Sequence, residues 1–505
     1  MPGFHVEHFG CRAARADGEA VSDRLRAAGL GEGDPSAAEV VVVNTCSVTA
    51  EADRAARAYI RRAHRQNPEA RIVVTGCYAQ RAPEELAGLK GVAAVVGNSH
   101  KALAPGIVLQ LVRSGAAGRP GDGSVARPEL VRVESLLAGS AASAAQVWVD
   151  DRFAHSFLEE AQVVPGAQTR PNLKIQEGCA NRCTFCVIPQ TRGSSRSLPI
   201  ASVLRQVEGF VAAGGNELVL SGINLGRWGR DFSGSPDACE VGLLRRTLAG
   251  LVRRILDETA LPRLRLSSIE PMDWDGELIG LMAEFAHSRN AGPRLARHAH
   301  LPLQSGSDAV LRRMHRRYRP WHYVEKVWAL VEAAGTELTL GADVMVGFPG
   351  ETDGEFEETL ELVGELPFGY LHLFPFSARP GTRGWALHAE RPVAAAVVEE
   401  RMAALRALAK EKSRAHRERF VGRELEAITL NTPTVVADAG RTLGLTENFL
   451  PVEIQGRLAA NRLVRLRVRG LNGEGTLEAV PAASAQGPAG SFAAHSYGGN
   501  IAVGV

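Results

Sequence analysis

Short, nearly continuous apolar runs that alternate with helical stretches limit the fold of this chain more than any other feature. Such runs predict parallel strands, because each helix must cross back over the sheet before the next strand begins. Three of them occur early in the chain, and six more occur between residues 169 and 387. The early strands are expected at 4–9, 39–44 and 71–76. The later strands are expected at 172–177, 217–222, 263–268, 298–304, 338–348 and 370–376.

These patterns divide the chain into five segments and predict an α/β fold. The early strands indicate a parallel α/β sheet in an N-terminal domain, residues 1–113, and Ala, Gly and Ser runs indicate a linker at 114–168. The later strands predict a partial (β/α)6 barrel, which with a following helical stretch forms a central domain, 169–420. Residues 421–480 alternate with β spacing and turn glycines, which favours a small β-barrel. The tail, 481–505, is expected to be disordered.

Composition excludes several classes of protein. The 505 residues include 58 Lys and Arg against 56 Asp and Glu, so the chain as a whole is not a polycation. No apolar run approaches the ~20 residues of a membrane helix, and no basic segment leads into an apolar one near the start. We therefore expect a cytoplasmic protein with no membrane partner. Seven cysteines are too few for a disulfide scaffold, so clustered cysteines are expected to bind metal.

Three closely spaced cysteines, Cys179, Cys183 and Cys186, follow the first strand of the predicted barrel, in EGCANRCTFCVIPQTRG. We call them the central trio. Three thiolates on one loop can hold a 4Fe–4S cluster and leave its fourth iron without a protein ligand. A structural zinc site is the alternative, but it needs four ligands, and the nearest candidates, His155 and Cys239, have no useful spacing. The pattern therefore favours an iron–sulfur cluster.

The C-x3-C-x2-C loop, with an aromatic residue before its last cysteine, resembles that of the radical S-adenosylmethionine (SAM) superfamily. The resemblance implies that SAM binds the open iron, and that one electron from an unidentified donor cleaves it to a 5′-deoxyadenosyl radical. It also implies SAM contacts near the predicted strand ends, although any one of these residues could equally belong to an ordinary turn. The positions that match are Phe185, Gly214, Gly215, Glu217, Ser268, Glu270, Gln304 and Asp343.

A second set of cysteines, Cys11, Cys46 and Cys77, occupies a shared position, since each comes just after one of the three early strands. We call them the N-terminal trio. The carboxyl ends of parallel strands lie on one edge of a sheet, so we expect these thiols to converge on one site. Three separate buried cysteines are the alternative.

The segments around this trio, FGC, VVVNTCSVTAEAD and VVTGCYAQ, resemble the N-terminal domain of methylthiotransferases, which are radical SAM enzymes. The resemblance spans about residues 1–480 and implies that the N-terminal trio holds a second 4Fe–4S cluster. One position departs from the pattern: the family usually has Asn three residues after the first cysteine, and this chain has Ala14. A polar contact to the cluster or the substrate would be absent there.

The C-terminal part is basic, with 14 Lys and Arg against 7 Asp and Glu in residues 401–470. Arg465, Arg467 and Arg469 alternate along a predicted strand and would share one face, as in small β-barrels that grip nucleic-acid phosphates. A solvated charged face is the alternative. The segment GLTENFLPVEI resembles the TRAM domain, an RNA-binding barrel of methylthiotransferases, which implies tRNA as the partner.

Within the resembled family, three targets compete: isopentenyladenosine in tRNA, threonylcarbamoyladenosine in tRNA, and an aspartate of a ribosomal protein. The segment that runs from Ser47 to Asp53 resembles the threonylcarbamoyladenosine type. We therefore expect methylthiolation of carbon 2 of that nucleoside beside the tRNA anticodon, with two 4Fe–4S clusters and SAM. The alternatives outside this activity are a radical SAM enzyme of another reaction type and an RNA-binding iron–sulfur protein without catalysis.

Overall fold

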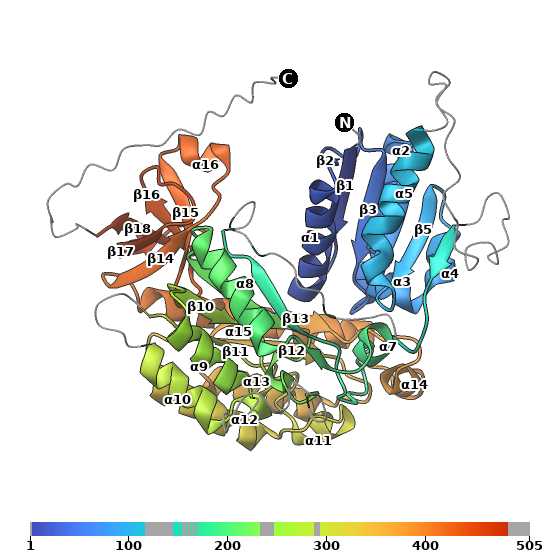
Figure 1. Cartoon of the computed structure of the whole chain (residues 1–505). Coiled ribbons are helices and arrows are strands. Elements are labelled where there is room, and N and C mark those ends of the chain that lie inside the picture. Colours follow the sequence, from blue (N-terminus) through green and yellow to red (C-terminus); the bar gives the residue numbers. More distant parts are fainter. Residues whose placement is uncertain are drawn as a thin grey trace, which may run out of the picture.

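The computed structural model describes residues 3–116, 145–153, 158, 163, 165, 169–232, 247–286 and 293–482. It contains an N-terminal parallel sheet, a central domain with parallel strands, and a closed C-terminal β-barrel, so the predicted α/β fold is confirmed. The N-terminal sheet and the C-terminal barrel stand apart on the same side of the central domain (Figure 1). Residues 483–505 of the predicted tail lie outside the described residues.

The N-terminal sheet has six parallel strands in the order β2-β1-β3-β4-β5-β6. The strands are β1 (Gly3–His8), β2 (Gly31–Glu32), β3 (Val40–Thr45), β4 (Arg71–Gly76), β5 (Val92–Gly97) and β6 (Gln146–Trp148). Strands β2, β5 and β6 were not predicted. The last of them falls within the segment expected to be a linker and pairs with β5, so part of that segment extends the sheet.

Helices cover both faces of this sheet. Every residue of β3 is therefore buried, although successive residues face opposite sides. Val40 and Val42 pack with α1 (Arg12–Ala27) and α5 (Ala104–Ala116). Val41 and Val43 pack on the other face, against the helices α2 (Ala50–Gln66), α3 (Cys77–Arg81) and α4 (Pro83–Ala87). Both faces being apolar explains the continuous valine run in the sequence.

The central domain has six parallel strands in the order β7-β9-β10-β11-β12-β13, with a bridge between Leu264 and Leu295 joining its two sheets. The strands are β7 (Asn172–Glu177), β9 (Glu217–Gly222), β10 (Arg263–Leu266), β11 (His298–His300), β12 (Thr339–Val346) and β13 (Phe368–Pro375), with a short antiparallel β8 (Arg196–Ser197) beside β7. The predicted partial barrel therefore forms, with β10 and β11 shorter than expected.

The helices of the central domain pack outside its strands around one apolar core. They are α8 (Ile200–Ala212), α9 (Leu248–Glu258), α10 (Gly276–Phe285), α11 (Asp308–Arg313), α12 (Pro320–Ala334), α13 (Asp353–Glu365) and α14 (Arg383–Glu390). The short helix α7 (Ile188–Arg192) instead lies beside α3 of the N-terminal domain. Two short 3-10 turns, η2 (Leu225–Arg227) and η4 (Pro271–Asp273), follow β9 and β10 of this domain, and η1 (Lys101–Leu103) follows β5 of the N-terminal sheet.

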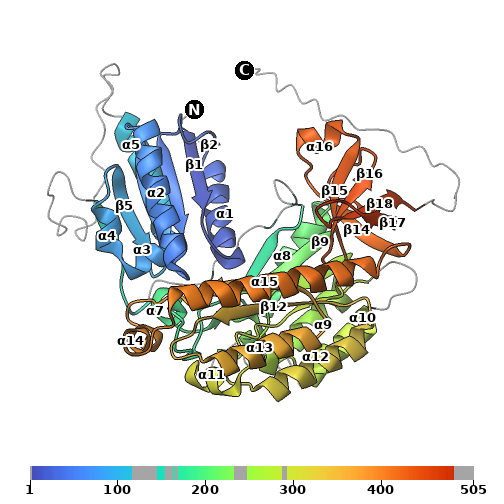
Figure 2. The same ribbon diagram turned by 180° about the vertical axis from the view of Figure 1, so that it is seen from behind.

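A long helix, α15 (Ala395–Glu418), runs along the central domain to the C-terminal barrel (Figure 2). The small β-barrel that the sequence predicted is present and closed, with the strand order β14-β15-β16-β18-β17. Its elements are β14 (Glu424–Thr429), α16 (Thr434–Asp438), β15 (Arg441–Thr446), β16 (Pro451–Gln455), β17 (Leu463–Leu471) and β18 (Leu477–Pro481). Among the described residues, no helix has the length and apolarity needed to cross a membrane.

Candidate active site

The central trio lies on the loop between β7 and α7, at the carboxyl end of β7. Gly178 opens this loop with a φ of +71°, and a Cβ there would lie 2.0 Å from the carbonyl oxygen of Ser194. Glycine is therefore required for the turn. The backbone N–H of Cys186 donates to the carbonyl oxygen of Cys183 at 3.1 Å. Cys179 and Cys186 both interact electrostatically with Cys183, so the loop brings the three thiols together.

Two side chains from distant segments donate hydrogen bonds to thiols of the central trio. Asn224 Nδ2, just beyond the end of β9, lies 3.4 Å from Cys179 Sγ, and an Arg316 guanidinium nitrogen lies 3.3 Å from Cys183 Sγ. Burial raises the pKa of Cys186 to about 12 and that of Cys179 above its ordinary value. Burial therefore favours the neutral thiols, and a bound metal cation would favour the thiolates.

The number of thiols in each trio bears on which metal group it could hold. In the described part of the chain, neither cysteine trio has all its sulfur atoms within 4.8 Å of one another. One tetrahedral zinc ion with Zn–S bonds of ~2.3 Å would bring its sulfur ligands to ~3.8 Å. His155 and Cys239, the zinc ligands considered from the sequence, lie outside the described residues. Three converging thiols supply the donor set of a 4Fe–4S cluster with one iron open.

Glu270 and Ser268, two predicted SAM contacts, lie beyond the carboxyl end of β10. Glu270 Oε2 accepts a 2.5 Å hydrogen bond from Arg316, which also reaches Cys183. The guanidinium of Arg316 is buried, yet Tyr318, Glu270 and Cys183 raise its pKa well above the ordinary value. Ser268 is exposed at the same end of the strand. The carboxyl ends of β7, β9 and β10 thus gather polar groups around the central trio.

A cavity of about 320 Å³ lies beside the central trio, and three predicted SAM contacts, Phe185, Gln304 and Asp343, line it together with Cys186. The rest of its wall is mainly apolar and includes Val48, Thr49, Val187, Met345 and Phe374. Val48 and Thr49 belong to the N-terminal domain and closely follow Cys46, so the cavity lies between the two domains. An apolar pocket with a few polar groups is typical of a small-molecule site.

Two of these polar groups are held rigidly. Gln304 has a left-handed φ of +66°, fixed by hydrogen bonds to β12: its N–H donates to Asp343 O and its oxygen accepts from Met345, both at 2.8 Å. Its side-chain Oε1 is buried and has no hydrogen-bond partner among the described residues, so it is free to accept from a ligand. Asp343 Oδ1 lies 3.1 Å from His300 Nε2 and 3.2 Å from His372 Nδ1. Burial would raise the pKa of Asp343, but these imidazoles hold it below its ordinary value.

The structure does not bring Gly214, Gly215 and Glu217 to this site, contrary to the sequence prediction. They lie at the amino end of β9, whereas the central trio follows the carboxyl end of β7, which runs parallel to it. Five residues of strand separate the two ends, ~17 Å. Glu217 is fully buried and accepts instead from Arg170 at 2.7 Å and Arg265 at 2.8 Å. The prediction assigned the residues before β9 to the site, whereas the residues after β9 lie there.

The N-terminal trio occupies the carboxyl edge of the N-terminal sheet, as its sequence positions predicted. Gly10 packs so closely on Cys46 that a Cβ on it would lie 2.7 Å from the Cys46 sulfur. Burial, Cys77 and Cys11 together raise the pKa of Cys46 to about 12, so the three thiols lie near one another. Cys46 and Cys77 are buried, and Cys11 is exposed. This donor set also fits a 4Fe–4S cluster with one iron open.

Polar side chains surround the N-terminal trio from both domains. Asn98 Nδ2 and Arg192 Nε donate to Cys77 Sγ at 3.5 Å and 3.3 Å. Arg192 belongs to α7, which begins two residues after the central trio, so this short helix connects the two cysteine sites. Ala14 is buried, and its carbonyl oxygen accepts from the side chain of Asn44. Sequence reasoning missed Asn98, Arg192 and Asn44.

A buried ion cluster joins the two domains beside the cavity. Asp53 on α2 accepts from Arg81 of the N-terminal domain at 2.7 Å and from Arg379, which follows β13 of the central domain. The same two arginines donate to Ser47 Oγ, at 2.8 Å and 3.2 Å. Because Ser47 follows Cys46 directly, these contacts fix the N-terminal trio relative to the central domain.

The three arginines of β17, Arg465, Arg467 and Arg469, are exposed on one outer face of the C-terminal barrel, between buried Leu466 and Val468. Arg467 lies 3.1 Å from Glu424 of the neighbouring strand, and both side chains are about half exposed. We call these residues the β17 arginines. Their placement matches the predicted alternation, and their contact with RNA stays a prediction.

The class of the protein follows from the central domain. A cysteine loop at the carboxyl edge of six parallel strands, beside a cavity with polar groups, is the arrangement of a radical SAM enzyme. Residues 173–363 match the model of the Radical SAM superfamily. Residues 3–97, which hold the N-terminal trio, match the Uncharacterized protein family UPF0004.

Curated relatives cover nearly the whole chain. The "Threonylcarbamoyladenosine tRNA methylthiotransferase MtaB" of Bacillus subtilis is 33% identical over 90% of this chain and 90% of its own length. That of Aquifex aeolicus is 32% identical over 92% and 99%. The "tRNA-2-methylthio-N(6)-dimethylallyladenosine synthase" of Sorangium cellulosum is 34% identical over 85% and 82%. The chain belongs to the radical SAM tRNA methylthiotransferase family.

Proposed function

We propose that this enzyme methylthiolates carbon 2 of threonylcarbamoyladenosine beside the anticodon of tRNA in the cytoplasm, with one 4Fe–4S cluster on each cysteine trio. One observation carries the proposal: the cavity beside Cys186 is also lined by Val48 and Thr49, which closely follow Cys46. A base bound against Val48 and Thr49 would lie between the two clusters. The relatives from Bacillus subtilis and Aquifex aeolicus, which cover about nine tenths of the chain, are named for this nucleoside.

The central site fits SAM through its own side chains. Bound at the open iron, SAM supplies a radical that can remove the hydrogen of the base. Gln304 Oε1 and Asp343 could accept hydrogen bonds from the N–H groups of its amino nitrogen, and Phe185 would provide an apolar surface. Met345 and Phe374 line the same cavity and exclude water from the reacting atoms.

The N-terminal site would present sulfur to the base. Ser47, Asp53 and the two arginines that they bind hold Cys46 in a fixed position relative to the cavity. Such fixed placement of two reacting groups is a large part of catalysis, because orientation is settled before the reaction begins. The β17 arginines, on the domain at the other end of α15, would contact phosphates of the tRNA. A reductant, which we have not identified, must supply electrons.

Mass spectrometry of tRNA nucleosides from cells with and without the gene tests the proposal. We expect the methylthio form of threonylcarbamoyladenosine to disappear on deletion and to return with the intact gene, but not with a variant that has the central trio replaced by alanine. A loss confined to methylthio-isopentenyladenosine would instead favour the second candidate, which the Sorangium cellulosum relative supports. No change in either nucleoside would refute both.

A further inference from the structure

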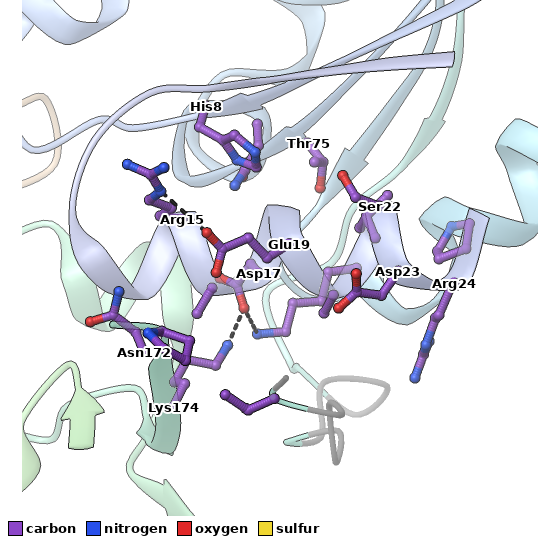
Figure 3. A pocket seen from close by; sticks show the side chains of 18 of the residues that line it. His8, Arg15, Asp17, Glu19, Ser22, Asp23, Arg24, Thr75, Asn172 and Lys174 are labelled. Atoms are coloured by element: carbon purple, nitrogen blue, oxygen red, sulfur yellow. Dashed lines mark hydrogen bonds and ion pairs between the residues drawn. The ribbon is translucent and has the colours of Figure 1, made fainter. Parts of the chain in front are cut away.

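Five charged side chains form a buried network between the N-terminal trio and the central domain. They come from α1, η1, β7 and α7, and we call them the charge network: Asp17, Lys101, Lys174, Glu177 and Arg192. Figure 3 shows Asp17 reaching from α1 toward Lys174 at the edge of a second cavity, of about 380 Å³. Arg192 is fully buried, and side chains of Glu177 and Asp17 are 1% and 12% exposed.

Every member of the network has an opposite charge as a direct partner. One Arg192 nitrogen donates to Asp17 at 2.9 Å and to Glu177 at 2.5 Å. Lys174 donates to Glu177 at 2.7 Å and also contacts Asp17, and Lys101 contacts the same two carboxylates. Burial would raise the pKa of both carboxyls, but these cations hold each below its ordinary value.

By formal charge, two carboxylates against two lysines and one arginine leave the network with one surplus positive charge, while burial lowers the pKa of Lys101. Arg192 places positive charge beside the N-terminal trio, because its Nε lies 3.3 Å from Cys77 Sγ. Another nitrogen of the same guanidinium is buried and has no hydrogen-bond partner among the described residues. An unsatisfied buried guanidinium N–H is costly unless a ligand accepts from it, and a sulfur of a bound cluster is such an acceptor.

We propose that the positive charge of Arg192, held beside the N-terminal trio by this network, raises the reduction potential of the cluster on that trio. The inference rests on the second cluster of the proposed function. An oxidised 4Fe–4S core has two positive charges, so three thiolates leave the site with one negative charge, which the network balances. Reduction adds another negative charge beside Arg192, and net charge and hydrogen bonds to sulfur are what set such potentials.

The test uses protein whose central trio is replaced by alanine, so that only the cluster on the N-terminal trio remains. After anaerobic reconstitution, iron content is measured, and the midpoint potential is determined by a titration followed by electron paramagnetic resonance. Arg192→Gln removes one positive charge and should lower the potential. At a fixed solution potential the ratio of reduced to oxidised cluster should fall at least tenfold, ~59 mV for one electron. Arg192→Lys keeps the positive charge, so its midpoint potential should stay close to that of the parent protein.

Changes of opposite sign make the test specific for charge. Asp17→Asn removes a negative charge from the network and should raise the potential, whereas damage to the fold would not produce shifts in opposite directions. Arg401→Gln is the matched control: Arg401 is also buried and binds two carboxylates, Glu351 and Asp353, but it belongs to α15. It should leave the potential unchanged.

Each outcome decides one claim. Full iron content with an unchanged potential in Arg192→Gln overturns the role of Arg192. If Arg192→Gln binds no iron, Asp17→Asn decides, because an unshifted potential there also overturns it. A parent protein that binds no iron after reconstitution would refute the second cluster itself, and with it the proposed function rather than the placement of charge.

Discussion

Replacing Glu217 by glutamine distinguishes the two roles considered for the residues before β9. If Glu217 contacted SAM, the variant would lose SAM cleavage and keep its stability. The structure predicts the reverse, because Glu217 is fully buried among three arginines: Arg170, Arg265 and Arg263, the last with a nitrogen at 3.4 Å. Burial would raise the pKa of Glu217, but these arginines hold it well below its ordinary value, so it is ionised.

The magnitude follows from what the substitution leaves behind. Arg263 keeps a carboxylate partner in Glu426 of the C-terminal barrel. Arg265 keeps only the carbonyl oxygen of Thr446 and the ring of Phe449 among its contacts. Removing one partner from a buried ion pair costs about 3–5 kcal/mol. For a unit of this size that is a fall of roughly 6–20 °C in the midpoint of thermal unfolding.

Calorimetry and an assay of SAM cleavage without tRNA measure the two effects on the same protein. Because Arg263 and Arg265 both contact the C-terminal barrel, we expect that barrel to come loose from the central domain at lower temperature, with SAM cleavage retained. Glu270→Gln is the matched control, since Glu270 binds Arg316 beside the central trio and should affect SAM cleavage with less loss of stability. Unchanged stability together with lost cleavage in Glu217→Gln would refute our reasoning.

Three further predictions concern iron, pH and salt. Reconstituted protein should contain about eight irons per chain, and alanine at either trio should halve that number, with SAM cleavage abolished only for the central trio. Burial lowers the pKa of His416 to about 4, so its contribution to stability is complete above pH ~6.5 and is lost as the pH falls to 4. The loss should reach about 3 kcal/mol and be absent in His416→Gln, as denaturant unfolding at several pH values can measure. Replacing the β17 arginines should weaken tRNA binding and reduce the slope of log K against log salt by roughly 0.7–0.9 per lost phosphate contact; an unchanged slope would exclude this strand from the RNA interface.

The cysteine sites could be predicted for two different reasons. The N-terminal trio follows three strand ends, and parallel strands bring those ends to one edge whatever the connections between them. The central trio lies on one loop, so its close spacing in the sequence was enough. Asn224, Arg316 and Arg192 could not be found in this way. Asn224 follows β9 and carried a usable signal, but Arg316 lies in a turn between two helices and Arg192 at the end of a five-residue helix. Their positions depend on tertiary packing, which no local pattern in the sequence encodes.

The segment from Ser47 to Asp53, which resembles the threonylcarbamoyladenosine type, also has a structural role. Ser47 and Asp53 bind Arg81 and Arg379, and Asp53 is buried in doing so. Their polar groups therefore hold the two domains together, a role that does not depend on the nucleoside. Thr49 uses its hydroxyl to cap α2, where it accepts from Ala52 at 3.2 Å.

Val48 is the remaining residue of that segment that faces the cavity, and its side chain is about half exposed. A single apolar side chain distinguishes ligands by only about 1–3 kcal/mol, whereas the threonylcarbamoyl group carries a carboxylate and the isopentenyl group carries none. Selection between them requires a cation or hydrogen-bond donors at the cavity. Ser377, which lines the cavity and accepts from the backbone N–H of Ala50 at 3.0 Å, is one polar group at that position. We therefore expect the choice of nucleoside to depend on groups outside the segment from Ser47 to Asp53.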